Sequence, residues 1–429
     1  MTRLSFYPIL VTRTTCRICG SAALTKVLSL GEQFIGGSFA GPDGRPLVLR
    51  KLPLDLVRCD PTRDQNGCGL VQLRHSVPPP VLYQSYWYRS GINQTMRDHL
   101  AGIARAAEKM VGLQADDLVV DIGCNDGTLL KSYRTPGLQI LGFDPASNIV
   151  QYARADGVEV VNDFFSAASF LAAGPKKKAK VVTSIAMFYD LENPHLFVGD
   201  VKAVLHEEGV WVLELSYLPT MLKMNSFDTI CHEHLQYYSL APMERLFAEH
   251  ELQVQDVELN DVNGGSFRLF VTHARRRHPS PEAGERVQTL RLQEFELALE
   301  TDAPYALFRK NIRKIRTDLR AFLTKAKKQK KLVHGYGAST KGNTTLQFCG
   351  ITPDLLPAIA DRNPDKWGSR TIGTDIQIIS EEESRKKRPD YYLVLPWHFI
   401  PEFKKREAEF LDRGGKFVLP MPLVHVVGR

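Results

Sequence analysis

The run of residues 119–127 constrains the fold more than any other part of the sequence. Two valines lead into a glycine-rich turn, and residues 128–131 are then expected to open a helix. The turn contains Asp121, Gly123, Asn125 and Gly127. Strand, glycine-rich turn and helix in this order are typical of nucleotide sites in doubly wound α/β sheets, because glycines let the backbone approach a ligand. The spacing Asp-x-Gly-x-x-x-Gly differs from the Gly-x-Gly-x-x-Gly of dinucleotide sites, so we expect a different cofactor.

Apolar runs alternate with polar stretches of helix length in two parts of the chain. In the first part they lie at 118–122, 139–143, 181–184 and 210–215. In the second part they lie at 331–335, 358–360, 391–395 and 416–420. This alternation predicts an α/β fold with two doubly wound, Rossmann-like domains. Between them, residues 273–330 show helical periodicity and no strand signal, and we expect a helical connector.

The turn resembles the first motif of class I S-adenosylmethionine-dependent methyltransferases. The resemblance implies that the turn wraps the methionine part of the cofactor, with Asp121 near its amino group. Asp144 ends the next strand, where nucleotide folds place an acidic residue that binds the ribose hydroxyls. Asp163 and Phe164 lie where the family contacts adenine.

Four of the seven cysteines lie in the first 70 residues, and they are Cys16, Cys19, Cys59 and Cys68. The first pair forms a Cys-x-x-Cys-Gly turn, which points two thiolates at one ion, whereas a longer loop separates the second pair. A short segment with little helical periodicity needs a cross-link, such as a bound metal ion, to fold. We therefore expect a structural zinc ion, because four thiolates leave no open coordination position. Four free or buried cysteines are the alternative.

Composition narrows the location and the partners only slightly. The net charge of +7 suits an anionic small substrate as well as nucleic acid. The amino terminus has one arginine and an apolar run broken by Pro8, which makes a poor signal peptide. No stretch approaches the ~20 apolar residues of a membrane span. We expect a cytoplasmic protein without a membrane segment.

Two segments carry candidate chemistry in the middle of the chain. Residues 83–96 are rich in aromatic and polar side chains, as in a lid over a site; an aromatic hinge between domains is the alternative. Residues 232–234 read His-Glu-His, shortly after the strand that ends near Ser216. A histidine can take a proton near neutral pH, and a neighbouring carboxylate can orient it. A metal-binding His-x-His and a surface loop with incidental histidines are the alternatives.

The second Rossmann-like segment begins with what resembles a phosphate cradle. Its candidate residues are Tyr336, Gly337, Ser339, Lys341 and Asn343, ahead of a helix. Backbone N–H groups at a helix start bind anions, and a lysine adds a point charge for a diphosphate. A degenerate turn that only packs is the alternative. Further lining candidates at nearby strand ends are residues 361–363, Lys366, residues 396–397 and His398.

Taken together, these segments resemble the nucleotide-sugar C-methyltransferase family, which acts at C3 of dTDP-linked 4-keto deoxysugars. The resemblance covers essentially the whole chain and includes the run 261–268. From that run, Asn263, Gly265, Ser266 and Arg268 are expected to bind substrate, together with Ser90 and Asn93 of the tyrosine-rich stretch. The implied architecture is a small N-terminal zinc-binding domain (1–80), a class I methyltransferase middle domain with an aromatic lid (81–272), the connector (273–330) and a second Rossmann-like C-terminal domain (331–429).

The resemblance also implies a mechanism. A 4-keto group acidifies the proton on C3, a base removes this proton, and the enolate carbon accepts the methyl group. His234 is the candidate base, and Glu233 orients it or holds the substrate. A hydroxyl from Tyr86 or Tyr88 is expected near the developing oxyanion. His232 is the competing base. The partner is a nucleotide-diphosphate sugar, and a monomer is compatible with this function.

Two departures from the family pattern concern the substrate site. Cys231 stands where the family has a tyrosine before His-Glu-His, and residues 89–93 replace a serine-rich run. A small-molecule O-methyltransferase and a non-catalytic nucleotide-sugar-binding protein of the same fold are therefore the alternatives. A nucleic-acid methyltransferase is disfavoured, because the Asn/Asp-Pro-Pro-Tyr/Phe motif of base methylation is missing from the sequence and the basic runs lack interleaved aromatic residues.

Overall fold

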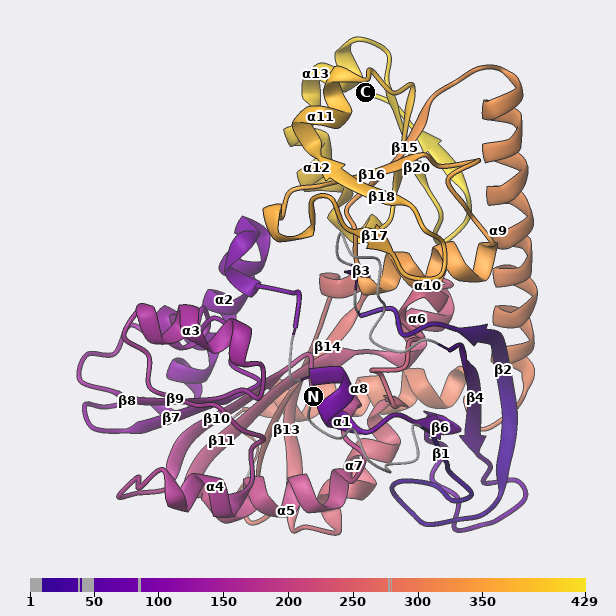
Figure 1. Ribbon diagram of the computed structural model, residues 1–429. Helices are drawn as coiled ribbons and strands as arrows, with labels where there is room; N and C mark the ends of the chain where they lie inside the picture. Colours follow the sequence, from indigo (N-terminus) through magenta and orange to yellow (C-terminus); the bar gives the residue numbers. More distant parts are fainter. Residues whose placement is uncertain (1–9, 38, 41–49, 84–85, 277, 279) are drawn as a thin grey trace.

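The computed structural model in Figure 1 describes residues 10–37, 39–40, 50–83, 86–276, 278 and 280–429. Most of the stretch considered as a signal peptide, residues 1–9, lies outside this range. Two residues of the tyrosine-rich stretch, 84–85, also lie outside it.

A seven-stranded sheet forms the middle domain, in the order β13-β14-β11-β10-β7-β8-β9. Strands β7 to β11 run parallel, and β13 and β14 return antiparallel at one edge. The strands are β7 (Leu118–Ile122), β8 (Gln139–Phe143), β9 (Val160–Val161), β10 (Ala179–Ile185), β11 (Leu205–Ser216), β13 (Leu252–Asn260) and β14 (Ser266–His273). The predicted doubly wound sheet is confirmed.

Helices cover both faces of this sheet, because successive side chains of a strand point to opposite sides. Val119 packs with helices α2 and α3, whereas Val120 packs with α5, α7 and α8. The helices of this part are α2 (Gln94–Val111), α3 (Ser147–Ala155), α4 (Ala167–Ala172), α5 (Pro194–Val204), α6 (Leu218–Lys223), α7 (Leu240–Ala248) and α8 (Pro281–Glu296). Apolar side chains on both faces make the sheet a rigid platform for the loops at its edge.

The helix predicted to start at 128–131 is wrong. After β7 the chain makes a single 3₁₀ turn, Leu130–Ser132, and then runs to β8. Pro136 disfavours helical backbone in the residue before it, and Gly137 follows with a φ of 74°. These two residues leave too few positions for an α-helix in this connection.

The N-terminal domain is a four-stranded antiparallel sheet in the order β12-β5-β4-β2. Its outermost strand, β12 (Gln236–Tyr237), comes from the chain just after the His-Glu-His segment. The other elements are β1 (Val11–Thr12), β2 (Leu24–Gln33), β4 (Leu52–Cys59), β5 (Val71–Leu73), β6 (His75–Ser76) and α1 (Pro79–Tyr83). The N-terminal domain therefore holds the backbone next to the candidate base.

The C-terminal domain contains an eight-stranded sheet in the order β21-β20-β19-β15-β16-β18-β17-β3. Its five central strands are parallel, as expected for a second Rossmann-like domain. Strand β3 (Phe39–Ala40) of the N-terminal part closes one edge. The remaining strands are β15 (Val333–Tyr336), β16 (Ala358–Asp361), β17 (Arg370–Thr371), β18 (Gln377–Ser380), β19 (Tyr391–Val394), β20 (Lys416–Leu419) and β21 (His425–Val427).

Helices complete the C-terminal part of the molecule. They are α10 (Thr340–Cys349), α11 (Glu381–Lys386), α12 (Ile400–Arg406) and α13 (Ala408–Asp412), preceded by the long α9 (Ala303–Lys328). Helix α9 runs along the outside of the molecule beside the β2–β4 hairpin and the C-terminal sheet (Figure 1). Among the described residues, no helix combines the length and apolarity needed to cross a bilayer.

Candidate active site

Two cavities open where the middle and C-terminal domains face each other. The larger cavity has a volume of about 400 Å³ and lies at the carboxyl ends of β7, β8, β10 and β11. The smaller cavity, of about 160 Å³, lies at the carboxyl ends of β15 and β16. Open α/β sheets bind ligands at these ends of their strands. Tyr86, Tyr88, Ser339 and Thr340 line both cavities, so the two cavities are neighbours.

The predicted cofactor residues gather at one end of the larger cavity. Asp121, Gly123, Asn125, Asp144, Asp163 and Phe164 line it, whereas Gly127 does not. The carboxylate of Asp144 accepts hydrogen bonds from the backbone N–H groups of Asn125, at 2.9 Å, and Ala146, at 2.8 Å. The hydrogen bond to Asn125 fixes the glycine-rich turn relative to the end of β8. Gly127 instead packs close to Ala153, where an added Cβ would lie 3.1 Å from its methyl group.

These residues suit S-adenosylmethionine. The cavity volume falls within the range of small-molecule sites. Phe164 is 41% exposed, although large aromatic side chains are usually buried, so its ring is free to contact adenine. Burial raises the pKa of Asp121 to about 7, and Thr183 donates to this carboxyl at 2.6 Å. A cationic amino group beside Asp121 would stabilise its charged form.

His234 lies at the wall of the same cavity, and its orientation is defined by one contact. Its Nδ1 is 2.8 Å from the carbonyl oxygen of Thr229. A carbonyl only accepts hydrogen bonds, so Nδ1 carries the hydrogen and Nε2 keeps its lone pair. Burial, together with the positive charge of Lys341, lowers the pKa of His234 to about 3. The ring is therefore neutral near neutral pH, and its Nε2 carries a free lone pair.

His232 lies elsewhere. It is 3% exposed, is not among the residues lining either cavity, and its Nε2 lies 3.2 Å from the carbonyl oxygen of Leu52 in β4. Burial lowers its pKa to about 4. Residues 231–234 form a turn, closed by a hydrogen bond from the N–H of His234 to the carbonyl oxygen of Cys231 at 3.2 Å, and this turn separates the two histidines. Only His234 of the pair faces the cavity.

Two carboxyl groups, each with one oxygen that has no hydrogen-bond partner among the described residues, line the cavity of the candidate base. Glu233 Oε2 and Asp190 Oδ1 are buried and have no partner among the described residues. Both residues line the larger cavity. Burial raises the pKa of each carboxyl, and the charge of Glu233 raises the pKa of Asp190 further. This corner of the cavity can accept hydrogen bonds from hydroxyl or amino groups of a ligand.

Sequence reasoning missed Asp190 and its neighbour Tyr189. Both lie in the loop after β10, and the Tyr189 ring centroid is 4.3 Å from that of His234. The backbone carbonyl of Tyr189 accepts a hydrogen bond from the N–H of Leu235 at 2.8 Å. The only signal in the sequence was their position at the carboxyl end of a parallel strand. Tyr189 supplies an aromatic wall beside His234.

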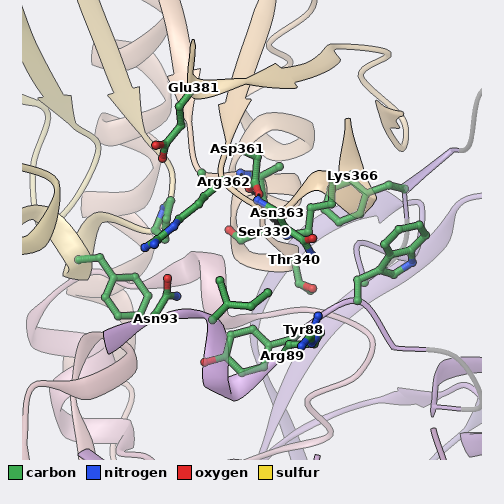
Figure 2. Close-up of a pocket in the computed structure, with 18 of the residues that line it drawn as sticks. Tyr88, Arg89, Asn93, Ser339, Thr340, Asp361, Arg362, Asn363, Lys366 and Glu381 are labelled. Atoms are coloured by element: carbon green, nitrogen blue, oxygen red, sulfur yellow. Dashed lines mark hydrogen bonds and ion pairs between the residues drawn. The ribbon is translucent and has the colours of Figure 1, made fainter. Parts of the chain in front are cut away.

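The predicted substrate residues divide between the two cavities. Ser90, Asn263, Lys341 and His398 line the larger cavity, and Asn93, Gly337 and Lys366 line the smaller one. Ser339 lines both, as do the two tyrosines of the lid. Figure 2 shows the smaller cavity, with Tyr88, Arg89 and Asn93 facing residues of the C-terminal domain.

Five predicted substrate residues line neither cavity. Tyr336 is buried in the C-terminal core and donates to Glu407 at 2.7 Å. Asn343 is also buried, and its Nδ2 donates to the carbonyl oxygen of Gly36. Gly265 and Ser266 form the β13–β14 connection, and Arg268 pairs with Glu214 at 2.9 Å. The side chains of Tyr336, Asn343 and Arg268 therefore contact other parts of the protein rather than either cavity.

The four N-terminal cysteines converge as predicted. Their sulfur atoms all lie within 4.8 Å of one another, with Cys16 and Cys68 at 3.5 Å and Cys19 and Cys59 at 3.4 Å. Tetrahedral Zn–S bonds of about 2.3 Å place sulfur atoms roughly 3.8 Å apart. The cluster therefore fits one structural zinc ion.

The zinc cluster is connected to the active-site loop. Arg17, between the first two cysteines, is buried and lies 3.5 Å from Glu192, which lines the larger cavity. The carbonyl oxygen of Ile18 lies 2.7 Å from Nε2 of His195 in α5. Folding of the cluster thus fixes the loop that carries Tyr189 and Asp190.

Three family models match successive parts of the chain. A zinc binding domain matches residues 16–83, a methyltransferase domain matches residues 89–257, and a C-methyltransferase C-terminal domain matches residues 261–422. These matches confirm the predicted zinc-binding and methyltransferase parts.

Individual relatives agree with these models. The C-methyltransferase NovU of Streptomyces niveus is 32% identical over 413 residues, which is 96% of each chain. A ubiquinone biosynthesis O-methyltransferase of Pasteurella multocida is 27% identical over 143 residues, covering 30% of this chain and 57% of the relative. Among solved structures, an S-adenosylmethionine-dependent methyltransferase of Clostridium acetobutylicum aligns over 41% of this chain and 91% of its own, with 10% identity and a TM-score of 0.32.

Proposed function

The chain belongs to the family of S-adenosylmethionine-dependent C-methyltransferases, and on this premise we propose that it methylates a carbon next to the ketone of a nucleotide-linked 4-keto sugar. The observation that carries the proposal is the shared cavity, in which the neutral imidazole of His234 faces the same space as the cofactor turn. Methyl transfer to a carbon needs a base, because a C–H group is not a nucleophile until its proton is removed. Bound at the turn, S-adenosylmethionine supplies the electrophilic methyl group.

His234 is proposed as the base that removes the proton from C3. Its Nε2 has no hydrogen, and its Nδ1 contact with Thr229 keeps the ring in this tautomer. A positioned general base contributes about 10²- to 10⁴-fold to a proton-transfer step. His232 is a weaker candidate, since its ring packs against β4 outside both cavities.

Glu233 and Asp190 are proposed to hold the sugar. Their partnerless oxygen atoms are buried at the cavity wall, and a buried acceptor without a hydrogen bond costs free energy until a ligand supplies a donor. Sugar hydroxyl or amino groups are such donors. Tyr86 and Tyr88 line both cavities and are proposed to close over the sugar and its phosphate linkage.

The nucleotide is assigned to the smaller cavity. Four cationic residues line it, namely Arg89, Arg362, Lys366 and Arg406, together with Gly337 at a φ of 82°. Guanidinium groups bind phosphate through paired N–H donors, and aromatic rings such as Trp87 stack on bases. A diphosphate between the two cavities would connect the nucleotide to a sugar beside His234.

The test is incubation with S-adenosylmethionine and a panel of nucleotide-linked 4-keto sugars, followed by carbon NMR of the product. A new C-methyl resonance on the carbon next to the ketone is expected. An O-methyl resonance would favour the O-methyltransferase alternative. Binding of both ligands without any methylated product would favour the non-catalytic alternative that Cys231 leaves open. The cytoplasmic location and the oligomeric state stay predictions.

A further inference from the structure

Lys341 lines the larger cavity together with His234, the proposed base, whereas the other cationic residues proposed to bind phosphate line the smaller cavity. It is the one lysine or arginine among the described residues that line the larger cavity, and it does not line the smaller one. The cations Arg89, Arg362, Lys366 and Arg406 line only the smaller cavity. Within the first turn of α10, Ser339 and Thr340 border both cavities, and the next side chain extends into the larger one.

The ammonium group of Lys341 is only partly satisfied by the protein. Its Nζ donates to the backbone carbonyl of Asn263 at 2.5 Å, which is its one hydrogen bond among the described residues. An ammonium has three N–H donors, so two are left for a ligand. Burial lowers the pKa of Lys341, whereas the carboxyl of Asp228 opposes this shift and favours the charged form. Lys341 lines the same cavity as His234 and His398, and its charge lowers the pKa of both rings.

The geometry points to Lys341 as the group that stabilises the enolate oxygen of the sugar, rather than as a ligand of its diphosphate. This inference rests on the proposed function. The 4-keto oxygen is one bond from the carbon that carries the ketone and two bonds from the carbon that loses its proton, so base and oxyanion donor must face the same small space. His234 and Lys341 meet this requirement because both line the larger cavity, although they come from different domains.

Nε2 of His234 takes the proton, the C–H electron pair becomes the new C=C bond, and the carbonyl π pair moves to oxygen. Lys341 donates N–H hydrogen bonds to this oxygen and keeps its own proton. In the methyl transfer that follows, the oxygen pair would restore the C=O bond, the C=C pair would form the new C–C bond, and the pair of the breaking S–CH₃ bond would go to the sulfonium sulfur of the methyl donor, which becomes a neutral thioether. A fixed cation in a cavity of low dielectric stabilises such charge far more than one in water.

The test separates enolate formation from nucleotide binding. The folded protein with S-adenosylhomocysteine and a nucleotide-linked 4-keto sugar in D₂O is expected to exchange the C3 proton, which mass spectrometry detects. At saturating sugar, Lys341→Met is expected to slow this exchange by about 10²- to 10³-fold, the usual effect of losing one oxyanion donor. Its affinity for the free nucleoside diphosphate, measured by calorimetry, is expected to be that of the wild type. Lys341→Arg, which keeps the charge, is expected to retain part of the exchange.

Two further variants serve as controls. Lys310→Met makes the same replacement at an exposed position of α9 and is expected to match the wild type. Lys366→Met, in the smaller cavity, is expected to weaken nucleoside diphosphate binding. Wild-type exchange in Lys341→Met would overturn the inference, and so would a loss of nucleoside diphosphate affinity in that variant. If the wild type neither exchanges nor methylates any keto sugar, the proposed function fails, and the inference about Lys341 fails with it.

Discussion

The Nδ1 atom of His234 lies 2.8 Å from the carbonyl oxygen of Thr229, and this contact decides which ring nitrogen is basic. Thr229 belongs to the 3₁₀ turn Phe227–Thr229 and is buried. Because its carbonyl oxygen can only accept, the hydrogen stays on Nδ1 and the lone pair on Nε2. The structure thus pre-organises a neutral imidazole as an acceptor before any substrate binds.

Replacing His234 by glutamine tests the base directly. The amide N–H₂ group of glutamine can still donate a hydrogen bond to the carbonyl of Thr229, but glutamine has no basic nitrogen that could take the proton. Methyl transfer in single-turnover assays is expected to fall by about 10²- to 10⁴-fold, with unchanged affinity for S-adenosylmethionine. The comparison variant is His232→Leu, which should keep its methyl transfer rate but lose about 1–3 kcal/mol of unfolding free energy, because the Leu52 carbonyl loses its partner. Equal inactivation of both variants would contradict the assignment of the base.

The pH dependence of the rate should report the depressed pKa of His234. A free histidine protonates near pH 6.5, and burial lowers the pKa of this one to about 3. Since lowering the pKa of a base preserves its neutral form as pH falls, kcat at saturating ligands should stay level through pH 6.5 and decline only in more acidic buffer. Measured kcat values with an acid limb near pH 6.5 would show that His234 is solvated in the complex or is not the base.

Zinc removal should disorganise the active-site loop as well as the N-terminal domain. Cys59→Ser is expected to eliminate bound zinc, lower the melting temperature and reduce methyl transfer, because the cluster contacts Glu192 and α5 through Arg17 and Ile18. Metal analysis and thermal melting measure the first two effects. Cys349→Ala, at a buried cysteine of α10 outside the cluster, should keep its zinc. Full zinc content in Cys59→Ser would contradict the four-cysteine site.

Asp144 should contribute strongly to cofactor affinity. Its carboxylate accepts two backbone hydrogen bonds from the loops that border the larger cavity. A hydrogen bond to a charged group contributes about 1.5–3 kcal/mol, and Asp144 is expected to accept such bonds from the ribose hydroxyls of the cofactor. Asp144→Asn removes the charge, so it is expected to weaken S-adenosylmethionine binding by about 10- to 100-fold in calorimetry. Asp156→Asn is a suitable control, because its ion pair with Lys131 is exposed and such pairs add little stability. Equal affinity in both variants would argue against Asp144 as a cofactor ligand.

Local signals in the sequence were sufficient for the cofactor turn and the cysteine cluster. Glycine spacing and the Cys-x-x-Cys pair depend on a few neighbouring residues; the structure brings the four cysteines together and places the turn at the larger cavity, except for Gly127, which packs against Ala153. The same kind of reasoning failed at 128–131, where a nearby proline and glycine overrode the helix expectation. It also assigned Arg268 to a substrate, although Glu214 from a neighbouring strand neutralises this arginine.

The sequence by itself determined the two α/β domains, the methyl donor and the zinc ligands, because hydrophobic periodicity and short motifs encode them locally. Only the tertiary structure decided which side chains share a cavity. The loop after β10 brings Asp190 to Glu233, and α10 of the C-terminal domain brings Lys341 to His234 of the middle domain. These pairs lie far apart in the chain, and their meeting depends on how the sheets pack. For the same reason His232 and His234, two positions apart, face different surroundings.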